Sequence, residues 1–152
     1  MSIQQYEQAR ELIERAGGGD FEGPKPESLV AKAENVLGVV FPPSYRHFLL
    51  QMGCGDFNGL EIYGLIGDNF EESTVPNGIW LTLHQRRAIN LPPSCIIIGD
   101  GGDGNFYAID TNRVHADGES PVIRVSIDGK YRERVADSFG NYLLDSVRGV
   151  LN

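Results

Sequence analysis

The sequence predicts an α+β fold with a helix at each end of the chain. Residues 2–16 and 138–150 place apolar side chains three or four positions apart, which is typical of amphipathic helices. The second half contains runs of β-branched and aromatic residues, and 19 glycines, nearly twice the ordinary share, separate many short elements. Because 152 residues is about the length of one domain, we expect residues 1–152 to form a single domain.

The first third of the chain predicts three helices. Residues 2–16, 27–37 and 43–52 each show helical spacing of apolar side chains. Glycine follows each of these segments, and proline opens the third one, as expected at helix ends and starts. Residues 20–26 contain two prolines and a glycine, so we expect no regular structure there.

The middle of the chain predicts a strand, a loop and a helix. Residues 57–65 alternate imperfectly between the two faces of a strand. Residues 67–78 are polar and hold three acids, and loops of about this length are often functional. Residues 79–89 should form a helix that carries the single tryptophan, Trp80.

The region before the last helix predicts an antiparallel meander. Residues 95–98, 105–110 and 121–127 are rich in β-branched and aromatic side chains. The Gly/Asp cluster at residues 99–104 predicts a hairpin between the first two runs, and Asp128-Gly129 predicts a turn after the third.

The overall charge excludes several classes of partner. The chain carries 21 Asp and Glu against 13 Lys and Arg, a formal charge of −8. Binding to nucleic acid or to an anionic membrane needs a cationic surface, so we expect neither partner. The first residues lack the charge and the apolar stretch of a signal peptide, and no apolar run is long enough to span a membrane. We therefore expect a cytoplasmic protein.

The glycine-rich turn at residues 99–104 is the most conspicuous local motif. A phosphate cradle usually has a lysine or a helix N-terminus beside its glycines, whereas this turn joins two strands and contributes two acids. A calcium loop would need oxygen ligands where Gly102 and Gly104 stand. The remaining interpretation is a turn in which Asp100 and Asp103 point towards solvent or a partner.

Residues for catalysis or metal binding do not form a recognisable pattern. Neither Cys54 nor Cys95 belongs to a local motif with a histidine, and both are expected to be buried free thiols. Glu71 and Glu72 are adjacent in a polar loop, where acids are usually only solvated. We therefore expect no enzyme activity, no cofactor and no metal.

Trp80 has two interpretations. On its predicted helix it is most simply an anchor in the core, which is the interpretation that we favour. Tryptophan is also over-represented among the residues that dominate protein interfaces, so a role in binding stays open.

Five short motifs follow one another between residues 27 and 147. They are AENVLG at 33–38, FPPSYRHFL at 41–49, GLEIYGL at 59–65, IGDGGDGNFY at 98–107 and ADSF at 136–139. Each motif is weak alone, but their ordered succession resembles the SUKH superfamily. This superfamily contains the Smi/Knr-type regulators of cell-wall synthesis in fungi and many bacterial immunity proteins.

The resemblance implies both a fold and a kind of function. The fold would be a curved, mostly antiparallel sheet with helices packed on one side. The function would be protein binding without catalysis, since bacterial members look like immunity proteins that neutralise polymorphic or contact-dependent toxin domains, often nucleases or deaminases. The alternative is an intracellular regulatory or scaffolding module, for example in cell-wall synthesis.

The charge distribution suggests how a toxin domain would be bound. Residues 54–110 carry a formal charge of −6, so we expect an acidic face that steers a basic partner towards it. The residues predicted to bind this partner are Asp68, Glu71, Glu72, Trp80, Asp100 and Asp103. Charge reversal at Glu71 and Glu72 is expected to slow association while leaving the fold intact.

Overall fold

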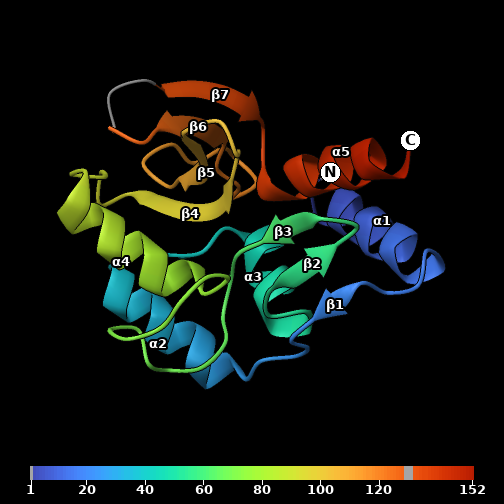
Figure 1. Ribbon diagram of the computed structural model, residues 1–152, viewed down its shortest axis with the longest axis horizontal. Helices are drawn as coiled ribbons and strands as arrows, with labels where there is room; N and C mark the ends of the chain where they lie inside the picture. Colours follow the sequence, from blue (N-terminus) through green and yellow to red (C-terminus); the bar gives the residue numbers. More distant parts are fainter. Residues whose placement is uncertain (1, 129–131) are drawn as a thin grey trace.

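The computed structural model describes residues 2–128 and 132–152, and within them the chain forms five helices and seven strands (Figure 1). In chain order they are α1 (Ser2–Arg15), β1 (Asp20–Phe21), α2 (Glu27–Leu37), α3 (Pro43–Gln51), β2 (Gly55–Phe57), β3 (Leu60–Ile62), α4 (Gly78–Ala88), β4 (Cys95–Asp100), β5 (Asn105–Asp110), β6 (Val122–Ser126), β7 (Arg132–Ala136) and α5 (Phe139–Leu151). The predicted α+β class and the helix at each end are confirmed. The predicted turn at Asp128-Gly129 lies partly outside the described residues.

The strands form two antiparallel sheets instead of the single curved sheet that we expected. The small sheet has the order β1-β2-β3 and the large sheet the order β4-β5-β6-β7. The two sheets meet where the Tyr63 N–H donates to the Ile98 carbonyl oxygen at 2.9 Å, just beyond the end of β3. The small sheet therefore continues the large one along part of the free edge of β4, and Figure 1 shows them adjoining there.

The small sheet differs from the sequence prediction in two places. Residues 57–65 are not one strand, because Asn58 and Gly59 have φ angles of 51° and 85° and turn the chain back as a hairpin. The dipeptide Asn-Gly is a strong hairpin signal that the alternation of residues 57–65 obscured. Asp20–Phe21, expected to lack regular structure, pairs with β2 as an edge strand.

The remaining free edge of β4 is covered by α4. The Ile97 N–H donates to the Thr82 Oγ1 at 2.9 Å, and Thr82 in turn donates to the Gly78 carbonyl oxygen. The Asn77 side chain fixes the start of α4 by accepting the N–H groups of Ile79 and Trp80, each at 3.1 Å. An edge strand that is paired in this way offers no template for another chain.

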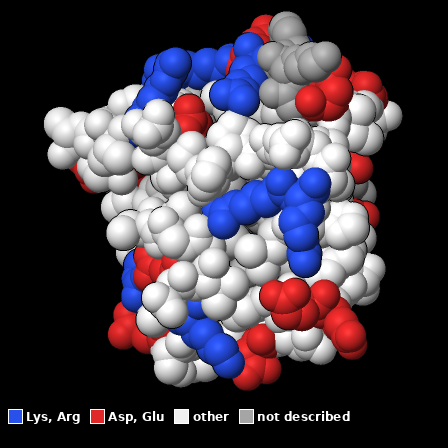
Figure 2. Space-filling model, turned by 90° about the vertical axis from the view of Figure 1, so that its left-hand side faces the viewer, with Lys and Arg blue, Asp and Glu red and all other residues white. Residues whose placement is uncertain are grey.

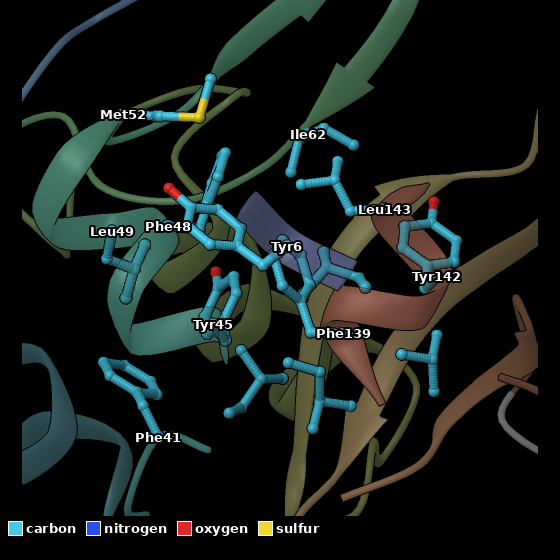
Figure 3. Packing of buried hydrophobic residues seen from close by; sticks show 14 of the residues in the cluster. Tyr6, Phe41, Tyr45, Phe48, Leu49, Met52, Ile62, Phe139, Tyr142 and Leu143 are labelled. Carbon is cyan, nitrogen blue, oxygen red and sulfur yellow. The ribbon is translucent and has the colours of Figure 1, made fainter. Parts of the chain in front are cut away.

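Two hydrophobic clusters divide the residues of β4 between them. Ile96 and Ile98 join the larger cluster, whereas Cys95 and Ile97 join the smaller one. In the larger cluster, rings from α3 and α5 pack together, with the centroids of Tyr45 and Phe139 4.9 Å apart (Figure 3). Helix α4 contributes to both clusters, so the helices do not all lie on one side of the strands.

The helices at the two ends of the chain lie side by side, and a buried polar network holds their starts (Figure 1). The Glu119 carboxylate is only 2% exposed and accepts the Ser44 N–H and Oγ–H, each at 2.9 Å. Ser44 Oγ then accepts the Gly140 N–H at the start of α5, and the Ser2 hydroxyl donates to Ser138. Burial raises the pKa of Glu119 above its usual range, although the hydrogen bonds from Ser44 oppose this shift.

Candidate binding groove

Three adjoining hollows follow the outer face of the small sheet and continue to α5. The first, of about 370 Å³, lies over β1, β2 and β3. The second, of about 330 Å³, shares Glu61 with the first and reaches the turn between β4 and β5. The third, of about 400 Å³, shares Leu60, Tyr107 and Tyr142 with the second and is bounded by β7 and α5. We call the three together the acidic groove.

Acidic residues dominate the lining of this groove, although one of them, Glu22, forms an ion pair with Lys25 at 3.1 Å. Among the described residues that line the three hollows there are six carboxylates and no Lys or Arg. The carboxylates are those of Asp20, Glu22, Asp56, Glu61, Asp100 and Asp145. A concave surface lined by charge of one sign concentrates the field, so the groove attracts cations and repels phosphates.

Three of these carboxylates lie directly opposite one another across the small sheet. Asp20 pairs in register with Asp56, and Asp56 pairs with Glu61. Alternate residues such as Phe57 and Ile62 point the other way, into the larger hydrophobic cluster. Like charges in directly opposed positions destabilise a sheet, and a cationic partner would relieve this repulsion.

The glycine-rich turn shapes the second hollow. The predicted hairpin is confirmed, with a β-bulge between Ile97 and Gly99. A side chain at Gly99 would place its Cβ 3.3 Å from the Tyr142 hydroxyl, so glycine leaves room for that ring beside β4. Gly102 and Gly104 have φ angles of 74° and 84°, which the turn requires and which other residues rarely adopt.

Asp100 and Asp103 are both exposed, and each fixes the turn with one carboxylate oxygen. Asp100 Oδ1 accepts the Gly102 N–H at 2.8 Å, and Asp103 Oδ1 accepts the Asn105 N–H at 3.2 Å. Asp103 Oδ2 also lies 4.0 Å from Arg124. Of the two, Asp100 lines the groove and Asp103 lies beside it.

The other predicted partner-binding residues lie on a different part of the surface, around α4. Asp68 forms an ion pair with Lys32 at 3.1 Å, and Glu71 lies 3.9 Å from Arg87. Glu72 is exposed in the same loop. Figure 2 shows the side of the molecule that carries α4, with Lys and Arg side chains across its middle and Asp and Glu towards its margins. The acids of the middle segment therefore do not form one face.

Trp80 is half-buried, so part of its ring belongs to the core and part is accessible to a partner. Its ring packs against the smaller hydrophobic cluster and stacks on His84, with 5.4 Å between the ring centroids. It does not line the acidic groove.

The two cysteines lack the surroundings of a catalytic nucleophile. Both are buried, and burial raises the pKa of each thiol to about 11, which disfavours the thiolate. In residues 2–128 and 132–152, the acids, histidines and cysteines form no group that could hold a metal ion. The same residues include no helix with the length and apolar character needed to cross a bilayer.

Comparison with known proteins places this fold in a family. The family model SUKH_5, described as SMI1-KNR4 cell-wall, matches residues 1–148. The chain belongs to the SUKH family. The SUKH chain is also 32% identical over 94 residues to the uncharacterized protein YnaB of Bacillus subtilis (strain 168). That match covers 61% of this chain and 55% of YnaB, so the SUKH chain aligns with only about half the length of this relative.

Most residues of the acidic groove were missed by the sequence analysis. Asp20 and Glu22 stand in a segment expected to lack structure, Asp56 stands just before the segment predicted to be one strand, and Glu61 stands within that segment. The Asn58-Gly59 signal could have brought the last two together across a hairpin. Nothing local to the sequence shows that β1 pairs with β2.

Proposed function

We propose that this SUKH protein binds and neutralises a cognate toxin domain that presents a basic surface. The observation that supports this proposal is the acidic groove, with six carboxylates and no Lys or Arg among its described lining residues. Family membership supports it at a coarser level, because the SUKH family is compatible with immunity and with regulatory roles.

The chemistry of the groove fits an inhibitor of a nucleic-acid enzyme such as a nuclease or deaminase. Such a toxin needs a cationic face to hold its substrate, and an acidic inhibitor that covers this face would block substrate binding. Charge mainly accelerates and orients the encounter. The half-buried ring of Tyr107, which packs on the buried ring of Tyr142 with 5.3 Å between their centroids, supplies aromatic contact area for affinity.

Co-expression tests the proposal directly. Toxin domains encoded beside this gene are expressed in a sensitive host with the wild-type chain, and survival and complex formation are measured. We expect one of them to be neutralised and to co-purify with the chain. The proposal fails if no neighbouring toxin is bound or neutralised.

Neutralisation should need no catalytic residue of the chain. Cys54→Ala removes the buried thiol that lines the first hollow. We expect this variant, once folded, to neutralise the toxin as well as the wild type does. A loss of protection while the complex still forms would instead indicate an enzymatic role.

A second candidate function is regulation of an endogenous protein in cell-wall synthesis, which the description of the matching family model favours. The two functions differ in what deletion of the gene does. Loss of an immunity protein changes survival only when the toxin is present, whereas loss of a regulator changes wall composition in toxin-free cells. Both functions fit the proposed cytoplasmic location.

A further inference from the structure

The second hollow of the acidic groove combines aromatic rings with carboxylates. Tyr63, Tyr107 and Tyr142 line it together with Glu61 and Asp100. Its other lining residues are two glycines and Leu60, so no cation of the described chain enters it. Its volume of about 330 Å³ leaves ample room for one side chain of a partner.

Tyr63 provides an observation independent of the acids. As a whole residue it is only 4% exposed, and among the described residues its hydroxyl forms no hydrogen bond, although this oxygen is not fully buried. Burial raises the pKa of this phenol to about 12, and the nearby negative charges of Glu61 and Asp100 add to the shift. The Tyr63 hydroxyl is not among the fully buried polar atoms that lack a partner, so it stays accessible from the hollow and can accept a hydrogen bond from a group outside the chain.

Tyr142 also lines this hollow. Figure 3 shows this ring at the margin of the larger hydrophobic cluster, with the hydroxyl pointing away from Phe139. The ring of Tyr107 is tilted against it at 47°. Gly99 keeps the space beside the Tyr142 hydroxyl open.

We propose that the second hollow binds the guanidinium group of an arginine side chain presented by the partner. A guanidinium is planar and weakly hydrated, so it stacks on tyrosine rings better than an ammonium group does. Its five N–H groups can donate to the two carboxylates and to the Tyr63 hydroxyl at once. This inference rests on the proposed function, since it names the residue that anchors the basic partner.

Small probes test the hollow without the partner. The wild-type chain is titrated with N-acetyl-arginine amide while the tyrosine ring resonances are followed by NMR. N-acetyl-citrulline amide, which has the same shape without the charge, and N-acetyl-lysine amide serve as comparisons. With the arginine probe we expect saturable shifts of the ring resonances of Tyr63, Tyr107 and Tyr142. The lysine probe should bind at least about fivefold more weakly, and the citrulline probe should not bind. Equal binding of citrulline or lysine, or no shift with arginine, would overturn the inference.

Paired variants localise the effect. Glu61→Gln with Asp100→Asn removes both charges from exposed positions and keeps side chains that can accept the same hydrogen bonds, so the fold should persist. We expect this pair to weaken binding of the arginine probe at least about tenfold. Glu71→Gln with Glu72→Gln removes the same charge from the α4 side and should leave it unchanged. Equal losses in both pairs would show that the probe senses only net charge.

The outcomes separate this inference from the proposed function. A toxin that is neutralised through the acidic groove, by a chain that ignores the arginine probe, refutes the arginine site alone. A chain that binds the arginine probe as expected but neutralises no neighbouring toxin refutes the toxin proposal alone.

Discussion

The acidic groove and the surface around α4 contain the same kind of side chain in opposite surroundings. In the groove, Asp56 lies between two other acids in register, whereas on the α4 side Glu71 and Asp68 each have a basic neighbour. Acids that face bases within the chain are already compensated, and exposed pairs of this kind contribute little to stability. The comparison teaches that the number of acids in a segment says less about binding than whether their neighbours neutralise them.

Charge reversal is expected to give the largest difference between the two surfaces. Asp56→Lys with Glu61→Lys should slow association with the basic partner at least about tenfold at low salt, because the groove would lose its attractive field. Glu71→Lys with Glu72→Lys changes the net charge equally but should slow it less than about threefold. Stopped-flow mixing measures both rates. If the α4 variant is the slower one, the original prediction for Glu71 and Glu72 holds and the groove is not the docking face.

Added salt should change the association rate less than charge reversal does, and only when the acids of the groove are present. Raising the ionic strength from about 0.01 M to about 0.15 M shortens the Debye length from roughly 30 Å to about 8 Å. We expect the association rate of the wild type to fall several-fold and that of the Asp56→Lys, Glu61→Lys variant to change little. A wild-type rate that is insensitive to salt would show that the acids only keep the surface solvated.

Neutral substitutions should change stability with opposite signs on the two surfaces. Asp56→Asn removes the middle charge of the opposed acids and should raise the free energy of unfolding by roughly 0.2–1 kcal/mol. Glu71→Gln removes one partner of the exposed ion pair with Arg87, whose atoms are 3.9 Å apart. It should lower the free energy of unfolding by less than about 0.5 kcal/mol. Urea denaturation at low salt measures both. Destabilisation by Asp56→Asn would mean that the groove acids do not repel one another appreciably.

The buried Glu119 is a third kind of acid, and its titration should change the stability least. Hydrogen bonds from Ser44 oppose the rise in its pKa that burial causes. A carboxyl whose pKa is raised by folding binds its proton more tightly in the folded state, so stability falls as pH rises from the unfolded to the folded pKa. We expect this fall in the wild type and its absence in Glu119→Gln, measured by denaturation between about pH 4 and 7. An identical pH dependence in both proteins would contradict it.

The helices were predictable because their signals are local. Apolar spacing in residues 2–16 and 27–37 reproduces α1 and α2 to within a residue, and the β4–β5 hairpin follows from the glycines between two apolar runs. Residues 20–21 and 57–65 were misjudged for different reasons. A two-residue strand such as residues 20–21 is too short to show an alternating pattern. In residues 57–65 the apolar alternation continues past the Asn58-Gly59 turn and therefore hides it.

The candidate site was predictable only in part. Asp100 was identified because its turn is conspicuous in the sequence, and it does line the groove. Asp68, Glu71 and Glu72 stand in an equally acidic loop, but their neighbours Lys32 and Arg87 come from distant positions in the chain. The resemblance to the SUKH family was confirmed, yet family membership does not show which surface binds.

The sequence by itself determined the class of fold, the ends of most helices, the sign of the charge and the family. These properties depend on residues within a few positions of one another or on composition. Tertiary structure alone decided that Asp20, Asp56 and Glu61 face one another and that Tyr63, Tyr107 and Tyr142 line one hollow. The physical reason is that strand register and the docking of α5 are set by packing between distant segments, and only that packing determines which charges remain unpaired.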